Sequence, residues 1–327
     1  TIPYEGAGFE IYNADGEKMT MMYSYPSPTA IDVFYTNSEG YLITPEVLPY
    51  GEYSLVEVQA PYGYVLDKTP VSFSVSSENA EEENSLTIVK VEKQNTAQKG
   101  KISVHKTGDI FTSVATASSA YTNENGEMIV NPTTYTPVFA NGDLSGAVFQ
   151  ITAKEDIVTL DGTIRAYAGD VVSEITTDEN GYAETEPLYL GKYEVREIKA
   201  PYGYVLNNEP KDVELTYAGQ EFEVRDTVNT AFENEYQSVR ISLSKVMESD
   251  EQFGIYGNDY YTSVRFGLFA AEDITAADGS VIPADGLISE VSLDENMTAK
   301  FDVQIPFGRY YVQEIATDEH YVLNGEK

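Results

Sequence analysis

Cysteine is absent from the 327-residue sequence, and histidine occurs only twice, at His105 and His320. Without cysteine the chain cannot form disulfide bonds, thiolate metal sites or a cysteine nucleophile. Two distant histidines are too few for a histidine-based metal centre or a catalytic triad. We therefore expect no metal site and no cofactor, and we expect that the chain is not a turnover enzyme.

Basic residues are also scarce. The 20 lysines and arginines are outnumbered by 54 aspartates and glutamates, which gives a net charge of −34. This excess of negative charge repels phosphate backbones and anionic lipid headgroups, so we expect no nucleic-acid partner. No apolar run approaches the roughly 18 residues of a membrane span, and no signal peptide is visible, so we expect no membrane insertion of this chain.

What the sequence does contain is an internal repeat. The segment from Gly51 to Leu66 returns from Gly191 to Leu206, and both copies include Ala-Pro-Tyr-Gly-Tyr. A looser third copy begins at Gly308. Length alone would suggest about two domains of roughly 150 residues, but the repeat predicts three.

The positions of the repeated segments set the expected domain boundaries. We predict a first domain over 1–100 that lacks its first strand, a complete domain over 101–239, and a third over 240–327 that lacks its last strand. The two outer domains are therefore expected to be cut from a longer array. Within the middle domain, 107–144 is too long for one connection and predicts an inserted hairpin or exposed loop.

The repeated segments have the pattern of β-strands. Short runs around Tyr53–Leu55, Val195–Glu197 and Ile241–Leu243 alternate apolar and polar residues, as half-buried strands do. Turn sequences such as Asp178–Gly181 separate them, and no run has helical periodicity over more than two turns. We predict an all-β fold of tandem antiparallel β-sandwich domains arranged as beads.

Three polar residues continue the apolar face of a strand. Residues i, i+2 and i+4 share a face, so Lys106 follows Ile102 and Val104 inward, and Glu197 and Asn234 do the same on their strands. The outer repeats carry the same pattern at Glu57, Asn95, Lys245 and Glu314. A single Lys or Glu at such a place usually ends its strand in water, because these residues are almost never buried unless paired. Recurrence of all three types at fixed spacing favours a functional site.

An amine, a carboxamide and a carboxyl group brought together in an apolar interior can form an amide bond. Burial lowers the pKa of a lysine amine and raises that of a glutamic acid, so both can be neutral there. The amine then attacks the asparagine carbon, and the acid assists as ammonia leaves. Folding supplies the proximity. The reaction needs no cofactor and occurs once.

The chain resembles the CnaB-type (SpaA, prealbumin-like) domains of Gram-positive surface adhesins and pilins. The resemblance rests on Gly-Ala-x-Phe at 6–9 and 146–149, on the Glu-x-x-Ala-Pro-Tyr-Gly-Tyr stretches from Glu57 and Glu197, and on the Asn that precedes each Lys-bearing strand. It implies immunoglobulin-like, prealbumin-like sandwiches. The third copy departs from the pattern, because 316–321 lacks the Pro and the Gly.

In such domains a first-strand Lys joins a last-strand Asn with the help of the hairpin Glu. The resemblance thus implies a crosslink between Lys106 and Asn234 with Glu197 as its catalytic acid. Glu57 and Glu314 would be the catalytic acids of the outer domains. Asn95 and Lys245 would be crosslink residues whose partners lie outside this sequence.

The predicted function is that of a structural stalk in a Gram-positive cell-surface adhesin. We expect an extracellular location, with anchoring to the cell wall through regions outside this sequence. The expected partners are the neighbouring repeats of the same chain. An alternative stays open, in which the chain is a ligand-binding adhesin module that presents the insert 107–144 to a host or microbial surface ligand. A glycan-active enzyme is disfavoured, since no pair of carboxylates stands out.

Overall fold

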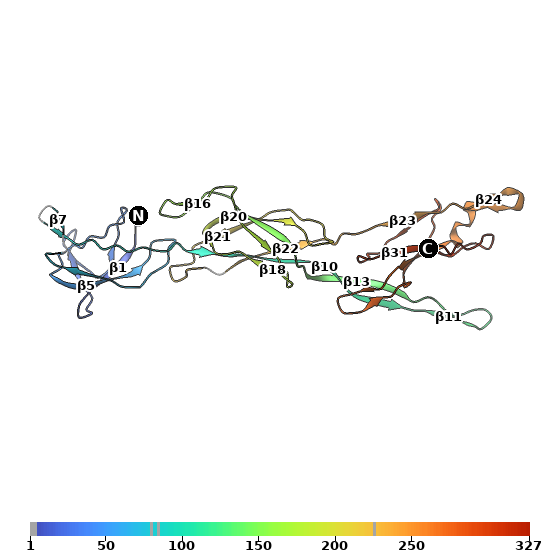
Figure 1. Ribbon diagram of the computed structural model, residues 1–327, viewed down its shortest axis with the longest axis horizontal. Helices are drawn as coiled ribbons and strands as arrows, with labels where there is room; N and C mark the ends of the chain where they lie inside the picture. The colour runs from blue at the N-terminus through green and yellow to red at the C-terminus, as the bar shows by residue number, and fades with distance from the viewer. Residues whose placement is uncertain (1–4, 79–80, 84–85, 225–226) are drawn as a thin grey trace. The chain divides into compact units, whose positions relative to one another are not determined.

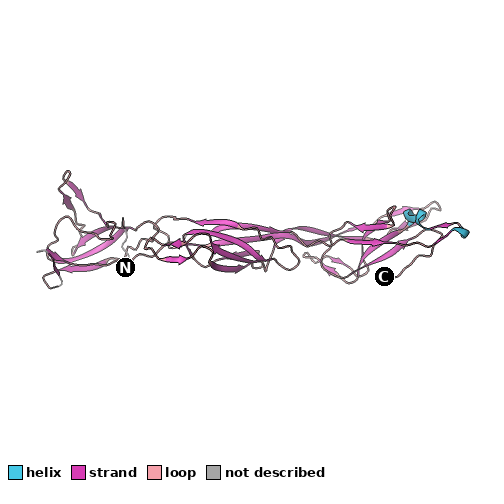
Figure 2. Ribbon diagram, turned by 90° about the horizontal axis from the view of Figure 1, so that it is seen from above, coloured by secondary structure: helices cyan, strands magenta, loops and turns pink. Residues whose placement is uncertain are grey.

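The structure is a computed structural model that describes residues 5–78, 81–83, 86–224 and 227–327. Strands make up nearly all of its regular structure, as Figure 2 shows. Two short 3-10 helices, η1 (Glu251–Phe253) and η2 (Gly257–Ser263), are the helices of these ranges. The prediction of an all-β fold is confirmed.

Contacts divide the chain into two compact units. The first contains residues 1–105, 145–199 and 208–232, and the second contains residues 106–144, 200–207 and 233–327. Residues of the predicted middle domain belong to both units, so the division into 1–100, 101–239 and 240–327 stays a prediction. The two units are described separately below.

The first unit consists of short strands, which Figure 1 labels in part. They are β1 (Gly8–Asn13), β2 (Met21–Tyr23), β3 (Thr29–Ile31), β4 (Phe34–Tyr35), β5 (Gly51–Gln59), β6 (Val71–Val75), β7 (Glu81–Glu83), β8 (Leu86–Ile88), β9 (Lys99–Gly100), β14 (Val148–Ala153), β15 (Ile157–Val158), β16 (Ile164–Ala166), β17 (Val171–Thr176), β18 (Tyr182–Glu184), β19 (Leu188–Tyr189), β20 (Gly191–Lys199) and β21 (Lys211–Leu215). Two further strands, β10 (Ile102–Ala117) and β22 (Val228–Asn234), begin in this unit.

Two four-stranded antiparallel sheets of the first unit have the same construction. Their strand orders are β4-β1-β5-β6 and β17-β14-β20-β21. In the first sheet Phe9 pairs with Glu57 next to a register shift, and in the second Phe149 pairs with Glu197 next to the same shift. The repeat seen in the sequence is therefore a repeat in strand order and in register.

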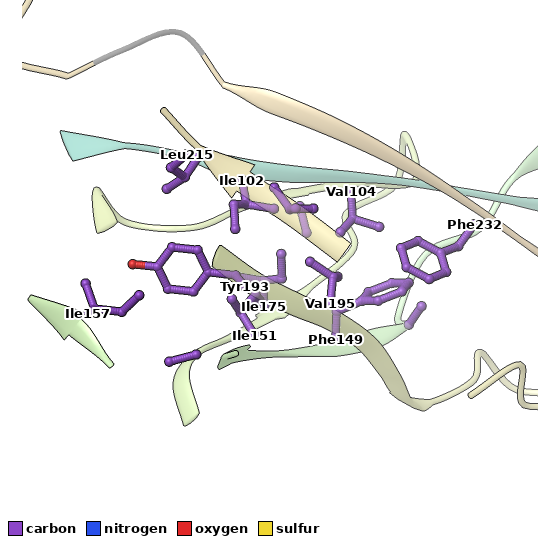
Figure 3. Packing of buried hydrophobic residues seen from close by; sticks show 14 residues of the cluster. Ile102, Val104, Phe149, Ile151, Ile157, Ile175, Tyr193, Val195, Leu215 and Phe232 are labelled. Atoms are coloured by element: carbon purple, nitrogen blue, oxygen red, sulfur yellow. The ribbon is translucent and has the colours of Figure 1, made fainter. Parts of the chain in front are cut away.

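One apolar core lies beneath the second of these sheets (Figure 3). The inward side chains of β10, β14, β20 and β22 build it at every second position, as expected of strands with one buried face. The fully or almost fully buried members include Ile102, Val104, Phe149, Val195 and Phe232. Phe149 and Phe232 pack ring against ring, with centroids 4.8 Å apart. Lys106, Glu197 and Asn234 each follow a member of this core by two positions.

The second unit contains the ends of β10 and β22 and the remaining strands. These are β11 (Ala120–Thr122), β12 (Met128–Val130), β13 (Thr134–Asp143), β23 (Ile241–Ser244), β24 (Ser249–Asp250), β25 (Ile255–Tyr256), β26 (Arg265–Ala270), β27 (Ile274–Thr275), β28 (Val281–Ile282), β29 (Leu287–Ser292), β30 (Thr298–Phe301) and β31 (Tyr310–Ala316). Strands β29, β26 and β31 are neighbours in one sheet, and β26 pairs antiparallel with both others.

The segment 107–144 forms a long hairpin. Strand β10 pairs with β13 from Thr107 opposite Asp143 to Ala117 opposite Thr134, and β11 and β12 form a small hairpin at the tip. Strand β13 also pairs in parallel with β29 at Thr134 and Leu287. Three hairpin side chains, Phe111, Val114 and Tyr135, pack against the core around Leu268 and Ile282. Part of the hairpin is thus built into the sheet and core of the third repeat.

Candidate crosslinking site

The three predicted glutamates occupy equivalent positions on equivalent strands. Glu57, Glu197 and Glu314 lie on β5, β20 and β31, and each is opposite a phenylalanine, at positions 9, 149 and 266 respectively. In all three places the register shifts immediately before that phenylalanine. Such bulges re-aim a side chain without ending the strand. All three carboxyl groups are buried, with 0%, 0% and 5% of the residue exposed.

These phenylalanines are residues that the sequence analysis did not assign a role. The Gly-Ala-x-Phe element marks them in the first two repeats, and that signal could have been used. Phe9 and Phe149 are buried, and Ala7 and Ala147 beside them are buried as well. Because an aromatic ring excludes water from the neighbouring position, this element supplies the apolar surroundings that a neutral carboxyl group needs.

Lys106 and Asn234 meet in the interior. The Lys106 Nζ donates a hydrogen bond to the Asn234 Oδ1, and the residues are 0% and 2% exposed. A glycine makes this approach possible: a Cβ at Gly108 would lie 2.6 Å from the backbone oxygen of Asn234 and 2.7 Å from Leu144 Cδ1. The amine and the carboxamide that the sequence analysis paired are therefore in direct contact.

In the first repeat the asparagine contacts the glutamate. The Asn95 Nδ2 lies 2.9 and 2.8 Å from the two carboxyl oxygens of Glu57 and also donates to the Val65 carbonyl oxygen. Burial raises the pKa of Glu57 above its usual value, against the opposing effect of its hydrogen bonds. The prediction that Asn95 lies on a last strand is wrong, because the stretch from 89 to 98 contains no assigned strand.

In the third repeat the lysine contacts the glutamate. The Lys245 Nζ lies 3.2 and 3.3 Å from the two carboxyl oxygens of Glu314. Asn324 donates a backbone hydrogen bond to Oε2, whereas the buried Oε1 accepts none from the described part of the chain. The Lys245 nitrogen is close to Oε1 in distance but does not have hydrogen-bond geometry there.

The three repeats together supply each pairwise contact of a Lys, Asn and Glu trio. The first has Asn with Glu, the middle has Lys with Asn, and the third has Lys with Glu. The glutamates of the three repeats lie at equivalent positions on equivalent strands.

One ion pair beside the first site was not predicted. The Lys93 Nζ lies 2.7 Å from Asp67 Oδ2, and the Asp67 N–H donates to Glu57 Oε2. The hydrogen bond from Lys93 holds the pKa of Asp67 well below its usual range. The ionised carboxylate is a poor target for an amine, so this pair is electrostatic and not a second crosslink.

In the described ranges, no group of three or more His, Asp or Glu side chains is placed to hold a metal ion. Within the same ranges, no helix is long and apolar enough to cross a membrane.

Comparison with known proteins decides the family. The family model of the SpaA prealbumin-like fold domain matches residues 2–90 and 139–230, which together are more than half of the chain. The chain belongs to the SpaA prealbumin-like family. The resemblance predicted from the repeated motifs is therefore confirmed. The matched ranges omit most of the hairpin 107–144, as expected if the hairpin is an addition to a SpaA domain.

Individual relatives of this SpaA chain match different shares of its length. The trypsin-resistant surface T6 protein of Streptococcus pyogenes serotype M6 is 30% identical over 94 residues, which are 29% of this chain and 16% of that protein. The Bacillus anthracis TIE protein shares the fold over 99% of this chain and 44% of its own, with 23% identity and a TM-score of 0.56. The minor pilin GBS52 of Streptococcus agalactiae is 17% identical over 75% of this chain and 87% of its own, with a TM-score of 0.25.

Proposed function

We propose that this chain is a structural segment of a Gram-positive surface adhesin or pilus protein, and that a self-formed amide bond between Lys106 and Asn234 closes its middle repeat. Membership of the SpaA family and the match to a streptococcal surface protein support the structural role and an extracellular, cell-wall-associated location. The observation that carries the proposal is the contact of a fully buried Lys106 amine with the Asn234 carboxamide.

The reaction exchanges one amide for another. The neutral Lys106 amine attacks the Asn234 Cγ, so that the Nζ–Cγ bond forms and the Cγ–Nδ2 bond breaks. A proton lost by the attacking nitrogen is transferred to the departing nitrogen, and one ammonia leaves. No oxidant, metal or other reactant is consumed, and the product has no net charge. Contact in the folded state replaces a collision in solution with a pre-oriented pair, which supplies most of the acceleration.

Glu197 is the proposed proton carrier. Its equivalents support the role, since Glu57 accepts hydrogen bonds from an asparagine amide and Glu314 lies beside a lysine amine. Burial raises the pKa of Glu57, which occupies the equivalent position on its own strand. A protonated acid can donate to the amide oxygen as charge develops there and can pass its proton to the leaving ammonia.

The bond would connect strands that are far apart in sequence. Lys106 and Asn234 are 128 positions apart, near the start and the end of the predicted middle domain. Tension that enters by β10 and leaves by β22 would then pass through the amide bond, because the covalent path is shorter than the path through the fold. A stalk that holds a tip away from the cell wall needs this property.

Intact-mass measurement tests the bond. The parent chain should be lighter than its sequence mass by one ammonia. Lys106→Met and Glu197→Gln should both restore the full mass. Lys245→Met and Glu314→Gln are matched controls in the third repeat and should keep the loss. A parent chain at full sequence mass, or the same loss in Lys106→Met, would refute the proposal.

A second candidate function rests on the tip of the hairpin. Tyr121, Met128 and Val130 are 56%, 74% and 66% exposed there, which is unusual for apolar side chains on strands and suits contact with a ligand. Replacing residues 119–131 by a short turn should abolish adhesion to host or microbial surfaces if the tip is the binding site. Unchanged adhesion would reject this candidate. Only the tip should be removed, because the base of the hairpin is part of the third repeat.

A further inference from the structure

The Ala-Pro-Tyr-Gly-Tyr segment has no part in the amide-forming chemistry, although it is the most specific motif of the sequence. It forms the same turn at 60–64 and at 200–204. The N–H of the last tyrosine donates to the proline carbonyl in both copies, Tyr64 to Pro61 and Tyr204 to Pro201. Gly63 and Gly203 have φ of +83° and +88°, a conformation that glycine adopts without strain.

Each turn closes on the residues that follow the crosslink asparagine. In the first repeat Val65 N donates to Thr96 O, and Gln98 N donates to Gly63 O. The middle repeat has the same two bonds, from Val205 N to Glu235 O and from Gln237 N to Gly203 O, at the same lengths of 2.9 and 2.8 Å. The turn therefore lies where the chain leaves one repeat for the next.

At the first turn, a ring from the next repeat lies on the motif. Tyr217 packs on Tyr62, with ring centroids 4.7 Å apart, and its hydroxyl donates to the Tyr64 carbonyl oxygen. The Gln98 side chain, in a residue only 1% exposed, donates to the carbonyl oxygens of Gly219 and Phe222.

A second glutamine, on the loop of the next repeat, bonds to the backbone beside this turn. Gln220, from the loop that carries Tyr217, accepts from the Ala60 N–H and donates to the Val58 carbonyl oxygen. A side chain from each repeat therefore forms hydrogen bonds with backbone groups of the other repeat.

At the second turn the ring is Phe307. It packs on Tyr202 and on Tyr236 with centroids 5.3 Å away in both cases, and its N–H donates to the Tyr236 hydroxyl. The contact is so close to the backbone that a Cβ at Gly203 would lie 2.0 Å from the Phe307 ring. At Gly63 an added Cβ would meet nothing within 4 Å.

We propose that the Ala-Pro-Tyr-Gly-Tyr turn is a docking site for the following repeat, and that it takes one aromatic ring from a loop of that repeat. The ring comes from different loops, after β21 in one case and before β31 in the other, so the turn is the constant element. The first tyrosine of the motif supplies the face on which the ring packs. Docking sets the orientation of consecutive repeats and does not depend on the amide bond.

Distance measurements between spin labels test this at the first turn. The chain has no cysteine, so labels at Glu39→Cys and Glu179→Cys, both exposed, report only the relation of the first two repeats. The parent should give a narrow distance distribution. Tyr62→Ala and Tyr217→Ala should each increase the undocked fraction about 2- to 10-fold, as expected for loss of an aromatic pair.

The controls separate docking from folding and from the crosslink. Tyr41→Ala removes another exposed tyrosine of the first repeat and should leave the distribution unchanged. Tyr62 is 71% exposed, so its substitution should leave the melting temperature and the loss of ammonia intact. A broad distribution in the parent, or Tyr62→Ala and Tyr217→Ala distributions that match Tyr41→Ala, would overturn the proposal whatever the intact mass shows.

Two glycine variants test the second turn. Gly63→Ala and Gly203→Ala impose the same backbone strain, but only Gly203→Ala places a methyl group against the docked ring. Hydrogen exchange should therefore quicken more at the Gln237 amide in Gly203→Ala than at the Gln98 amide in Gly63→Ala. Equal effects in the two variants would contradict docking of Phe307 on this turn.

Discussion

Lys106→Met is the substitution that separates a covalent link from ordinary packing. Methionine nearly conserves the volume of the lysine stem, so the variant keeps the apolar contacts of a fully buried side chain and loses the amine. If the bond forms in the parent, the variant loses closure of a loop of 128 positions. By analogy with disulfides, such a loop contributes roughly 4–5 kcal/mol.

That free energy converts to a large change in melting temperature. For a domain of this size we expect the transition of the middle repeat to fall by roughly 10–20 °C. Differential scanning calorimetry of the full chain measures it, and intact mass on the same samples shows which species is linked. Asn234→Leu should give a similar fall, because it removes the same bond.

The double variant tests whether Lys106 and Asn234 contribute through one shared bond. Two substitutions that remove one shared bond are not additive, so Lys106→Met with Asn234→Leu should melt close to either single variant. Additive losses would mean that the two side chains contribute separately, and the reasoning would be refuted. A fall of only 1–2 °C in Lys106→Met, about what ~0.5 kcal/mol gives, would refute it as well.

Three further predictions concern other parts of the chain. Because burial raises the pKa of Glu57, the native first repeat holds a proton that the unfolded chain releases, so its stability should fall as pH rises from the ordinary glutamate pKa to the raised one. The Glu57→Gln variant should lack this fall when melting temperatures at pH 4 and pH 7 are compared. An identical pH dependence in the parent and the variant would contradict this prediction. Tyr193→Phe should cost about 1 kcal/mol in chemical denaturation, because the hydroxyl donates to the Tyr189 carbonyl oxygen in a nearly buried position, whereas Tyr167→Phe, at an exposed position, should be neutral. Phe111→Ser should destabilise the third repeat by roughly 1–3 kcal/mol, because the ring contacts the core of that repeat. Limited proteolysis should then release the third repeat faster. A loss of stability confined to the middle repeat would show that the hairpin is not part of that core.

Strand alternation was sufficient to predict which residues are buried at the site. Lys106, Glu197 and Asn234 are 0%, 0% and 2% exposed, as the two-residue period of a strand requires once its apolar face is known. The same alternation continues at Asn95 although no strand is assigned there: the odd-numbered residues from 91 to 97 are partly buried, the even-numbered ones are exposed, and the Asn95 amide contacts the buried Glu57. The local pattern gave the correct face but could not show that the segment has no strand partner.

Contacts between distant segments could not be predicted in the same way. The pairing of β13 with β29 joins Thr134 to Leu287, and the hydrogen bond from Val114 N to Ser280 Oγ joins residues 166 positions apart. Any exposed sheet edge offers the same backbone groups, so no local pattern selects the partner. The bulges that aim Glu57 and Glu197 inward are likewise set by the register of two strands and not by one.

Peptide sequencing of a protease digest by mass spectrometry tests the central claim most directly. The account predicts one branched peptide that contains both Lys106 and Asn234, lighter by one ammonia than its two arms, with fragment ions that place the link at these side chains. Two separate linear peptides, each with its unmodified mass, would contradict it.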